Sequence, residues 1–243
     1  MKPENILKQL RQERKMQYKG GIYNLTQIEL AYNSNRIEGS QLSKEHTRSL
    51  FETKTITAGK EELIRADDVI EARNHFRAFD YILENADQKL TEDNIKEIHK
   101  ILKQGTSDAD LSWFKVGEYK AMANIVGGHD TTPPDQVADH INALLDTYNA
   151  LAQKTLTDVI DFHVRFEQIH PFQDGNGRVG RLIMFKECLQ NNIVPFIIDN
   201  QHKNFYYRGL DQYDKEKGYL VDTCLSAQDK YKAFCVKLVP EFM

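Results

Sequence analysis

Apolar residues recur at helical spacing along nearly the whole chain, and this periodicity limits the possible folds. In residues 158–169, DVIDFHVRFEQI, they fall three or four positions apart and form a stripe along one side of a helix. Similar patterns predict further helices near residues 4–17, 26–37, 43–52, 61–85, 92–104, 135–152, 178–191, 203–215 and 219–237. We therefore expect an all-α fold.

One segment, residues 117–134, departs from the helical pattern. It contains Gly127-Gly128 and ends in Pro133-Pro134, so extended chain around a turn fits better than a helix. We predict a short β-hairpin here, with an edge that could pair with an extended peptide. A simple connector between two helices remains the alternative.

The composition is that of a globular protein and excludes several classes of partner. The chain has 243 residues, 40% of them hydrophobic and 28% charged, with a formal net charge of −4. This charge gives no overall attraction to nucleic acid or to an anionic membrane, and no apolar run approaches the ~20 residues of a membrane span. The three cysteines (Cys188, Cys224, Cys235) are widely spaced, which favours free thiols and a cytoplasmic protein.

Between two predicted helices lies a short polar stretch, IHPFQDGNGRVGR. Pro171 should end the first helix, because the residue before a proline disfavours the α conformation, and His170 would then lie at that helix end. Residues 174–177, DGNG, form a tight turn whose backbone N–H groups can converge on one point. The next helix begins with Arg178 and Arg181, three positions apart, although cations at a helix N-terminus oppose the helix dipole.

A phosphate chain bound between the two arginines would explain this arrangement. The glycines would let the backbone approach phosphate oxygens, and Asp174 would hold Mg²⁺, which prefers one or two carboxylates plus phosphate oxygens. His170 is the side chain here whose ordinary pKa suits a general base at neutral pH.

A zinc site is the alternative for part of this stretch. His163, Glu167 and His170 lie four and three positions apart, so they share one helical face and could ligate a metal ion. This hypothesis leaves the glycines and both arginines unexplained.

The segment HPFQDGNGRVGR resembles the signature of the Fic/Doc family, which reads His-Pro-Phe, any residue, Asp or Glu, Gly-Asn-Gly-Arg, two residues, Arg. All fixed positions are filled, and the resemblance extends over residues 30–215. It implies the Fic (Fido) fold, a helical bundle with a small β-hairpin called the flap. It also implies an N-terminal helical region, residues 1–60, followed by a catalytic core with C-terminal helices, residues 61–243.

The resemblance implies a protein adenylyltransferase, which moves AMP from ATP to a hydroxyl of a target protein, itself included. His170 would deprotonate that hydroxyl, and the target would dock on the flap at residues 119–127. The residues implied to contact ATP are Asp174, which also carries Mg²⁺, Gly175, Asn176, Gly177, Arg178, Arg181, Val126, Gly127, Tyr206, Tyr207 and Asp214. Phe172 would anchor the loop in the core.

Two of these positions carry further information. Family members that transfer the γ-phosphate instead have a bulkier residue at the position of Gly175, so the glycine favours AMP transfer. Asp214 replaces a residue that is often asparagine in relatives, which puts its contact with the base in doubt. Tyr206 and Tyr207 are adjacent on a helix and do not share a face, so at least one of them could belong to the core.

The segment SNRIEGS, residues 34–40, resembles the family's inhibitory motif. Ser34 and Glu38 lie one helical turn apart, and Gly39 would stop the helix. The resemblance implies that Glu38 pairs with Arg181 and keeps the γ-phosphate from its proper position.

Other functions remain open at this point. Glu38 could instead position a water molecule that removes AMP from a modified protein, or the nucleotide site could serve a regulatory module without catalysis. A homo-oligomer is possible. Many relatives carry a C-terminal DNA-binding domain, which we expect to be absent from this chain, and with it any nucleic-acid partner.

Overall fold

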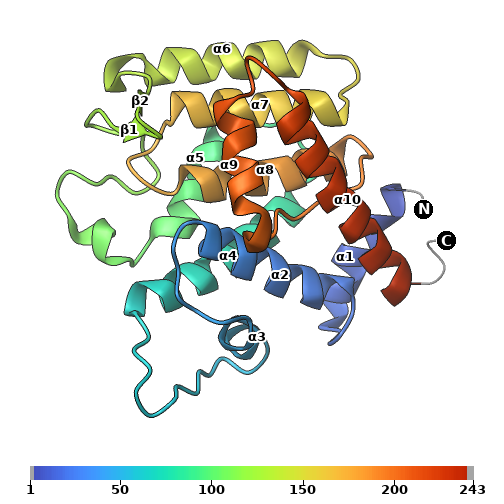
Figure 1. The fold of residues 1–243 in the computed structure, drawn as a ribbon. Coiled ribbons are helices and arrows are strands. Elements are labelled where there is room, and N and C mark those ends of the chain that lie inside the picture. Colours follow the sequence, from blue (N-terminus) through green and yellow to red (C-terminus); the bar gives the residue numbers. More distant parts are fainter. Residues whose placement is uncertain (1–2, 240–243) are drawn as a thin grey trace.

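The computed structural model describes residues 3–239, and this part of the chain contains ten α-helices and one two-stranded sheet. The helices are α1 (Glu4–Met16), α2 (Ile22–Ile37), α3 (Lys44–Glu52), α4 (Ala66–Glu84), α5 (Glu92–Lys103), α6 (Val137–Ala150), α7 (Leu156–Ile169), α8 (Asn176–Gln190), α9 (Lys203–Asp211) and α10 (Gly218–Leu238) (Figure 1). The strands are β1 (Ile125–Val126) and β2 (His129–Asp130), and short 3₁₀ turns cover Ser107–Asp110, Pro134–Gln136 and Asn200–His202. The prediction of an all-α fold with a small hairpin is confirmed.

Every helix predicted from periodicity is present, with differences at the ends. Helix α2 begins four residues before the predicted position 26, because the chain enters it directly from Gly20, at φ 80°, and the extended residue Gly21. Helix α4 begins at Ala66 rather than at residue 61, since Arg65 is extended and precedes two acidic residues in the first turn. Helix α9 ends at Asp211, before the predicted residue 215.

Helix α8 lies at the centre of the molecule, with α2, α4, α5 and α7 around it (Figure 1). Phe185 is 1% exposed and packs edge-on against Phe79 of α4, with ring centroids 5.3 Å apart. Leu182 of α8 and Phe166 of α7 belong to the same core and are both fully buried. The helix that carries Arg178 and Arg181 is therefore held from several sides.

The N-terminal helices belong to the same core as the rest of the chain. Ile6 and Leu10 of α1 and Ile22 of α2 are fully buried in the cluster that contains Phe185. The division of the chain at residue 60 stays a prediction.

The predicted hairpin is present but very short. Its two strands pair antiparallel, with Val126 opposite His129, and the turn uses positive φ at Gly127 and Gly128, which glycine adopts without strain. The segment before it is held against the polar loop, because the backbone N–H of Lys120 donates to the carbonyl of Pro171 at 2.8 Å. The side chain of Asn124 also donates to the carbonyl of Phe172 at 3.2 Å. The hairpin thus stands beside the loop that follows His170.

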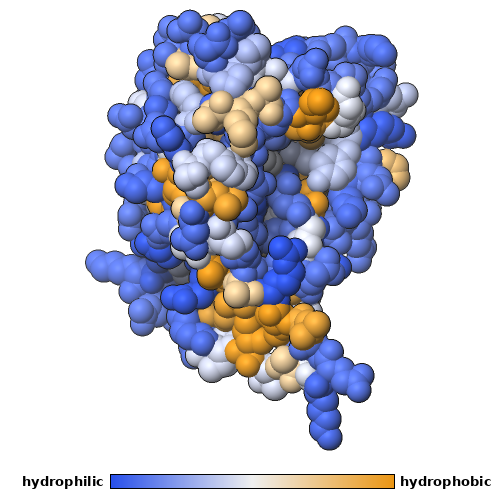
Figure 2. Space-filling model, turned by 90° about the vertical axis from the view of Figure 1, so that its left-hand side faces the viewer, coloured by the Kyte–Doolittle hydropathy of each residue, from blue (hydrophilic) through white to orange (hydrophobic). Residues whose placement is uncertain are grey.

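The face shown in Figure 2 is mostly polar, and its largest apolar patch lies in the lower part of the view. That part of the molecule contains α3 and the segment leading to α4, where Leu63 is 94% exposed and Ile56 and Ile64 are partly buried. Within residues 3–239, no helix is both long enough and apolar enough to cross a membrane. Cys188, Cys224 and Cys235 are buried free thiols, as predicted.

Candidate active site

His170 lies at the end of α7, as the proline after it predicted. Its backbone has φ 51° and ψ 63°, a left-handed conformation that turns the chain out of the helix. Its side chain is 16% exposed. Burial lowers the pKa of His170 to about 4, so the imidazole is neutral at neutral pH, which is the form that a general base requires.

The loop after His170 is held by its own hydrogen bonds and by packing against His99 of α5. Phe172 is fully buried and stacks on the ring of His99, with centroids 3.9 Å apart. The Asn176 side chain accepts from the backbone N–H of Phe172 and donates to its carbonyl, both at 2.8 Å. Gly175 has φ 84° and precedes the first residue of α8. The turn predicted over residues 174–177 is therefore shorter than expected, because Asn176 and Gly177 already belong to the helix.

Asp174 is an ionised carboxylate beside the start of α8. Its Oδ2 accepts from Nζ of Lys103 at 2.7 Å and from Nη2 of Arg178 at 2.9 Å. Burial alone would raise the pKa of Asp174, but the two cations lower it to about 2. The side chain is 47% exposed. One ionised and accessible carboxylate fits the needs of Mg²⁺ bound together with phosphate oxygens.

Arg178 and Arg181 are both buried, and their head groups reach different helices. Arg178 pairs with Glu71 of α4 at 2.6 Å and with Asp174. Arg181 donates from Nε to the hydroxyl of Ser34 at 3.0 Å and from Nη2 to the Ser34 carbonyl at 3.0 Å. A third hydrogen bond joins Nη2 of Arg181 to Oε1 of Glu38 at 2.6 Å, as the inhibitory motif predicted.

The local structure of SNRIEGS also follows its sequence. Helix α2 ends at Ile37, Glu38 follows at the helix end, and Gly39 has φ 102°. Glu38 reaches over the first turn of α8, since a Cβ at Gly177 would lie 2.3 Å from Oε1 of Glu38. The absence of a side chain at Gly177 therefore provides the space that the Glu38 carboxylate occupies.

The two tyrosines of α9 differ in their environment. Tyr206 is 1% exposed, and a hydrogen bond of 2.6 Å joins its hydroxyl to Nε2 of His163. The guanidinium of Arg181 lies 5.8 Å from the centroid of the Tyr206 ring. Tyr207 is 42% exposed and donates to the carbonyl of Ile37 at 3.1 Å. The structure thus brings both tyrosines to the side of the site occupied by Arg181 and Glu38.

Three other predicted contact residues lie at the surface. Val126 and Gly127 are exposed at the tip of the hairpin. Asp214 is 59% exposed and pairs with Arg165 at 2.8 Å and with Gln168 at 3.0 Å. Both partners belong to α7. The contact of Asp214 with a nucleotide base stays a prediction, and it would require the carboxylate to release these partners.

Several residues that shape the site gave no local signal in the sequence. Lys103 is 1% exposed at the end of α5 and binds Glu71, Asp108 and Asp174. His99 accepts from the N–H of Gly117 at 2.9 Å and supports Phe172. These contacts join different helices and loops of the fold, and no spacing rule reveals them.

The zinc alternative gains no support. Nε2 of His163 is engaged with Tyr206, and the described residues contain no group of three or more His, Cys, Asp or Glu side chains that could hold a metal ion.

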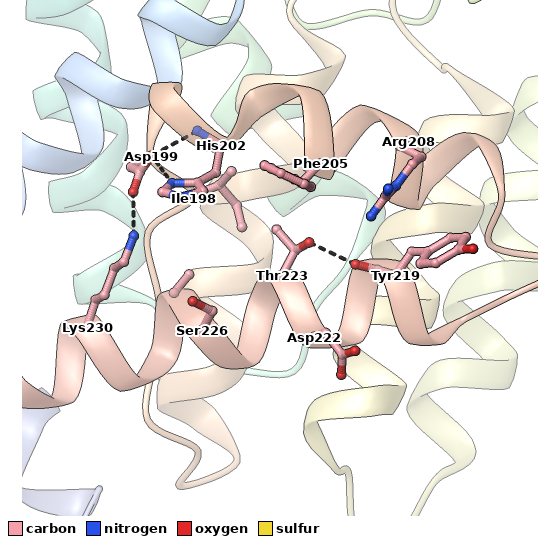
Figure 3. Close-up of a pocket in the computed structure, with 11 residues that line it drawn as sticks. Ile198, Asp199, His202, Phe205, Arg208, Tyr219, Asp222, Thr223, Ser226 and Lys230 are labelled. Carbon is pink, nitrogen blue, oxygen red and sulfur yellow. Dashed lines mark hydrogen bonds and ion pairs between the residues drawn. The ribbon is translucent and has the colours of Figure 1, made fainter.

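A separate cavity of about 340 Å³ lies between α9 and α10 (Figure 3). Phe205, Arg208 and Tyr219 line one end of it, and Asp199 and Lys230 form an ion pair of 2.9 Å at the other. None of the motif residues 170–181 lines this cavity.

Comparison with known proteins agrees with this geometry. Residues 89–188 match the model of the Fic/DOC family. The chain is 29% identical over 185 residues to a protein adenylyltransferase Fic of Nematostella vectensis, and 31% identical over 182 residues to one of Drosophila willistoni. The alignments cover 74% of this chain but only 42% and 35% of those relatives, so the chain spans less than half of their length. Residues 89–188 therefore form a Fic/DOC family domain.

The same fold occurs in solved structures. A Fic domain containing signaling protein from Bacteroides thetaiotaomicron superposes with a TM-score of 0.76 at 24% identity, covering 96% of both chains. Fic-1 of C. elegans superposes with a TM-score of 0.71 at 18% identity, covering 95% of this chain and 71% of that one. Together with the helices and the hairpin, these likenesses establish the Fic fold.

Proposed function

We propose that this protein transfers AMP from ATP to a hydroxyl side chain of a target protein, itself included, and that Glu38 restrains the reaction. The observation that carries the proposal is the placement of a neutral His170 beside a loop of glycines and two buried arginines, one of which is held by Glu38. The curated relatives named protein adenylyltransferase Fic support the reaction class.

The proposed chemistry assigns the proton to His170. The target hydroxyl attacks the α-phosphorus of ATP, its proton passes to the imidazole, and pyrophosphate leaves. Backbone N–H groups at the start of α8, together with Arg178 and Arg181, would stabilise the charge of the phosphates. Asp174 would hold Mg²⁺, which neutralises phosphate charge when bound. The residues thus act mainly by positioning and by charge, which phosphoryl chemistry requires.

The ion pair supplies the proposed restraint. While Arg181 is bound to Glu38 and Ser34, its guanidinium is occupied on several sides and cannot hold the γ-phosphate. A hydrogen bond between charged groups contributes about 1.5–3 kcal/mol. That is enough to keep the competent arrangement at roughly a tenth to a hundredth of the molecules.

The target would dock on the hairpin and the segment before it. The backbone edge around residues 119–127 is largely exposed beside His170, and an extended peptide could pair with it. Removal of AMP from a modified protein is the second candidate function. The observation that favours it is the position of the Glu38 carboxylate over Gly177, next to the proposed phosphate site.

Intact-mass spectrometry tests the proposal directly. The purified protein would be incubated with ATP and Mg²⁺, and we expect a fraction of it to gain the mass of AMP. His170→Ala should abolish the gain while leaving ATP binding intact, because it removes the base and leaves the phosphate contacts. A similar gain with His170→Ala would contradict the assignment. A loss of preformed AMP from a modified protein would favour the second candidate.

A further inference from the structure

Glu167 of α7 is an acidic residue that the family motif does not include, and it lies directly behind His170. Its Oε2 is 4.0 Å from Nδ1 of His170, and its Oε1 is 3.9 Å from Nδ1 of His163. The carboxyl is enclosed, since its side chain is 15% exposed and Oε1 has no hydrogen-bond partner in the described part of the chain. Nδ1 of His163 and Nδ1 of His170 are likewise unpartnered there.

The other charged and polar groups that face Glu167 are bonded elsewhere or are acidic, so the two histidines are its available partners. Arg181 of α8 faces it but is bonded to Ser34 and Glu38. Glu38 itself faces Glu167 from the end of α2. From α9, Tyr206 is bonded to His163 and Tyr207 to the carbonyl of Ile37.

Packing holds the carboxyl in this position. A Cβ at Gly180 would lie 2.8 Å from Oε1 of Glu167 and 2.6 Å from the ring of His163, so α8 closes over both groups with no space left. The side chain has little freedom to turn away from the two imidazoles.

We propose that Glu167 is a positioning residue for His170, whose carboxylate accepts a hydrogen bond from Nδ1–H of His170 and so keeps Nε2 free to take the proton. The inference rests on the function proposed above and adds to it the group that selects the tautomer of the base. The two atoms lie 4.0 Å apart, beyond the ~3.2 Å limit of such a bond, so the proposed arrangement includes a closer approach of the two side chains.

The proton balance makes the charge of Glu167 decisive. A neutral imidazole carries one N–H, and a carboxylate that accepts from Nδ1 leaves the lone pair on Nε2. When the target O–H bond breaks, an N–H bond forms at Nε2 and the imidazolium stays next to the carboxylate. A protonated Glu167 would instead donate to Nδ1, which puts the hydrogen of His170 on Nε2 and blocks the base.

Ionisation of Glu167 falls within an accessible range of pH. Burial raises the pKa of its carboxyl, Arg181 opposes this, Glu38 adds to it, and the result is about 8. The blocked arrangement therefore prevails below that pH and the productive one above it. Activity in the wild-type protein should rise with pH for this reason.

The pH profile of AMP transfer is the first test. In the wild type, the rate should rise about tenfold between about pH 7 and about pH 9, following the ionised fraction of one carboxyl. E167Q keeps the size of the side chain but does not titrate, so its profile should be flat over this range. D161N, at a partly exposed acid on the same helix, is the matched control and should keep the wild-type profile. A profile of E167Q with the wild-type rise would overturn the proposal.

The second test does not depend on any activity. Long-range ¹H–¹⁵N NMR spectra report which imidazole nitrogen carries hydrogen, and the His170 signals would be assigned by their loss in H170A. In the wild type, the hydrogen should move from Nε2 to Nδ1 as the pH rises through about 8, and in E167Q the tautomer should not change. The backbone carbonyl of Glu167 also lies near His170. If this carbonyl alone fixes the tautomer, the wild type and E167Q will give the same spectra at every pH, which contradicts the proposal. A tautomer shift without AMP transfer would instead show that the proposed function, and not the role of Glu167, is wrong.

Discussion

Nη2 of Arg181 lies 2.6 Å from Oε1 of Glu38, which joins two residues 143 positions apart in the chain. The arginine side chain is 3% exposed and the glutamate side chain 29% exposed, so the pair is screened from water on the side of the arginine. Burial alone would lower the pKa of Arg181, but Glu38 raises it, so the guanidinium stays charged. Arg181 therefore keeps its charge, and its partner Glu38 is the more exposed of the two, so an incoming phosphate could replace Glu38 at the guanidinium.

The hairpin gives a prediction about target docking. Ala123→Pro removes a backbone donor from an exposed residue whose N–H makes no backbone hydrogen bond within the described residues. We expect modification of the target to fall at least about fivefold, since each lost main-chain hydrogen bond contributes about 1 kcal/mol. The affinity for ATP, measured by calorimetry, should not change.

The control for this variant is Ala58→Pro, in an irregular segment remote in sequence from the hairpin. Equal modification by the wild type and Ala123→Pro would show that the target does not pair with this edge.

Close packing at Gly180 gives a prediction about stability. A Cβ at this position would lie 2.6 Å from Cε1 and Nδ1 of His163, and the rigid imidazole cannot yield without losing its hydrogen bond to Tyr206. We expect Gly180→Ala to lower the free energy of unfolding by about 1–3 kcal/mol, although alanine normally favours a helix. Urea denaturation would measure the change. Gly59→Ala, where the nearest atom is 3.7 Å away, should be nearly neutral. A more stable Gly180→Ala protein would show that the packing here is loose.

Buried histidines give a prediction about acid stability. Burial lowers the pKa of His75, His99 and His163 to about 3 and that of His170 to about 4. The unfolded chain, with histidine pKa values near the ordinary value of 6.5, therefore binds more protons than the folded one below that pH. The free energy of unfolding should fall as the pH drops from about 6.5 towards about 4, by about 1.4 kcal/mol per pH unit for each such histidine.

A single variant isolates one of these contributions. In His75→Leu, the free energy of unfolding should fall less steeply with decreasing pH, by the contribution of one histidine, because leucine does not titrate. The His75 ring has no hydrogen-bond partner among the described residues, so the substitution breaks no such bond. His140→Leu, at an exposed position, should leave the slope unchanged. Denaturation midpoints measured at several pH values would show the difference, and an unchanged slope in His75→Leu would contradict the prediction.

The sequence predicted the elements well because their signals are local. Apolar periodicity located every helix, and Pro171, Gly39 and the Gly127-Gly128 turn predicted where the chain changes direction. Helix ends without a strong local stop signal were predicted less accurately: the helix predicted from residue 61 begins at Ala66, after the extended residue Arg65.

The site was predictable only where its residues form a motif. Residues 170–181 and SNRIEGS carry their own spacing, and the structure joins them through Arg181. Lys103 was missed because its three carboxylate partners come from three different segments. Asp214 was predicted from its position after the tyrosines, yet its partners Arg165 and Gln168 lie on another helix. Pairings across the fold depend on tertiary packing, which spacing along the chain does not contain.

The contact between Glu38 and Arg181 is the point on which the proposed restraint depends. Glu38→Gly removes the carboxylate and frees the guanidinium for the γ-phosphate, which should raise the rate of AMP transfer by about tenfold to a hundredfold. In the double variant Glu38→Gly, Arg181→Ala this gain should disappear, because no arginine remains to be freed.

The most direct measurement is the rate at which the protein incorporates AMP from labelled ATP, compared between the wild type and Glu38→Gly at equal ATP and Mg²⁺. A marked increase in Glu38→Gly that is absent from the double variant is the expected result. Equal incorporation by the wild type and Glu38→Gly, into the protein itself and into any added target, would contradict the restraint by Glu38.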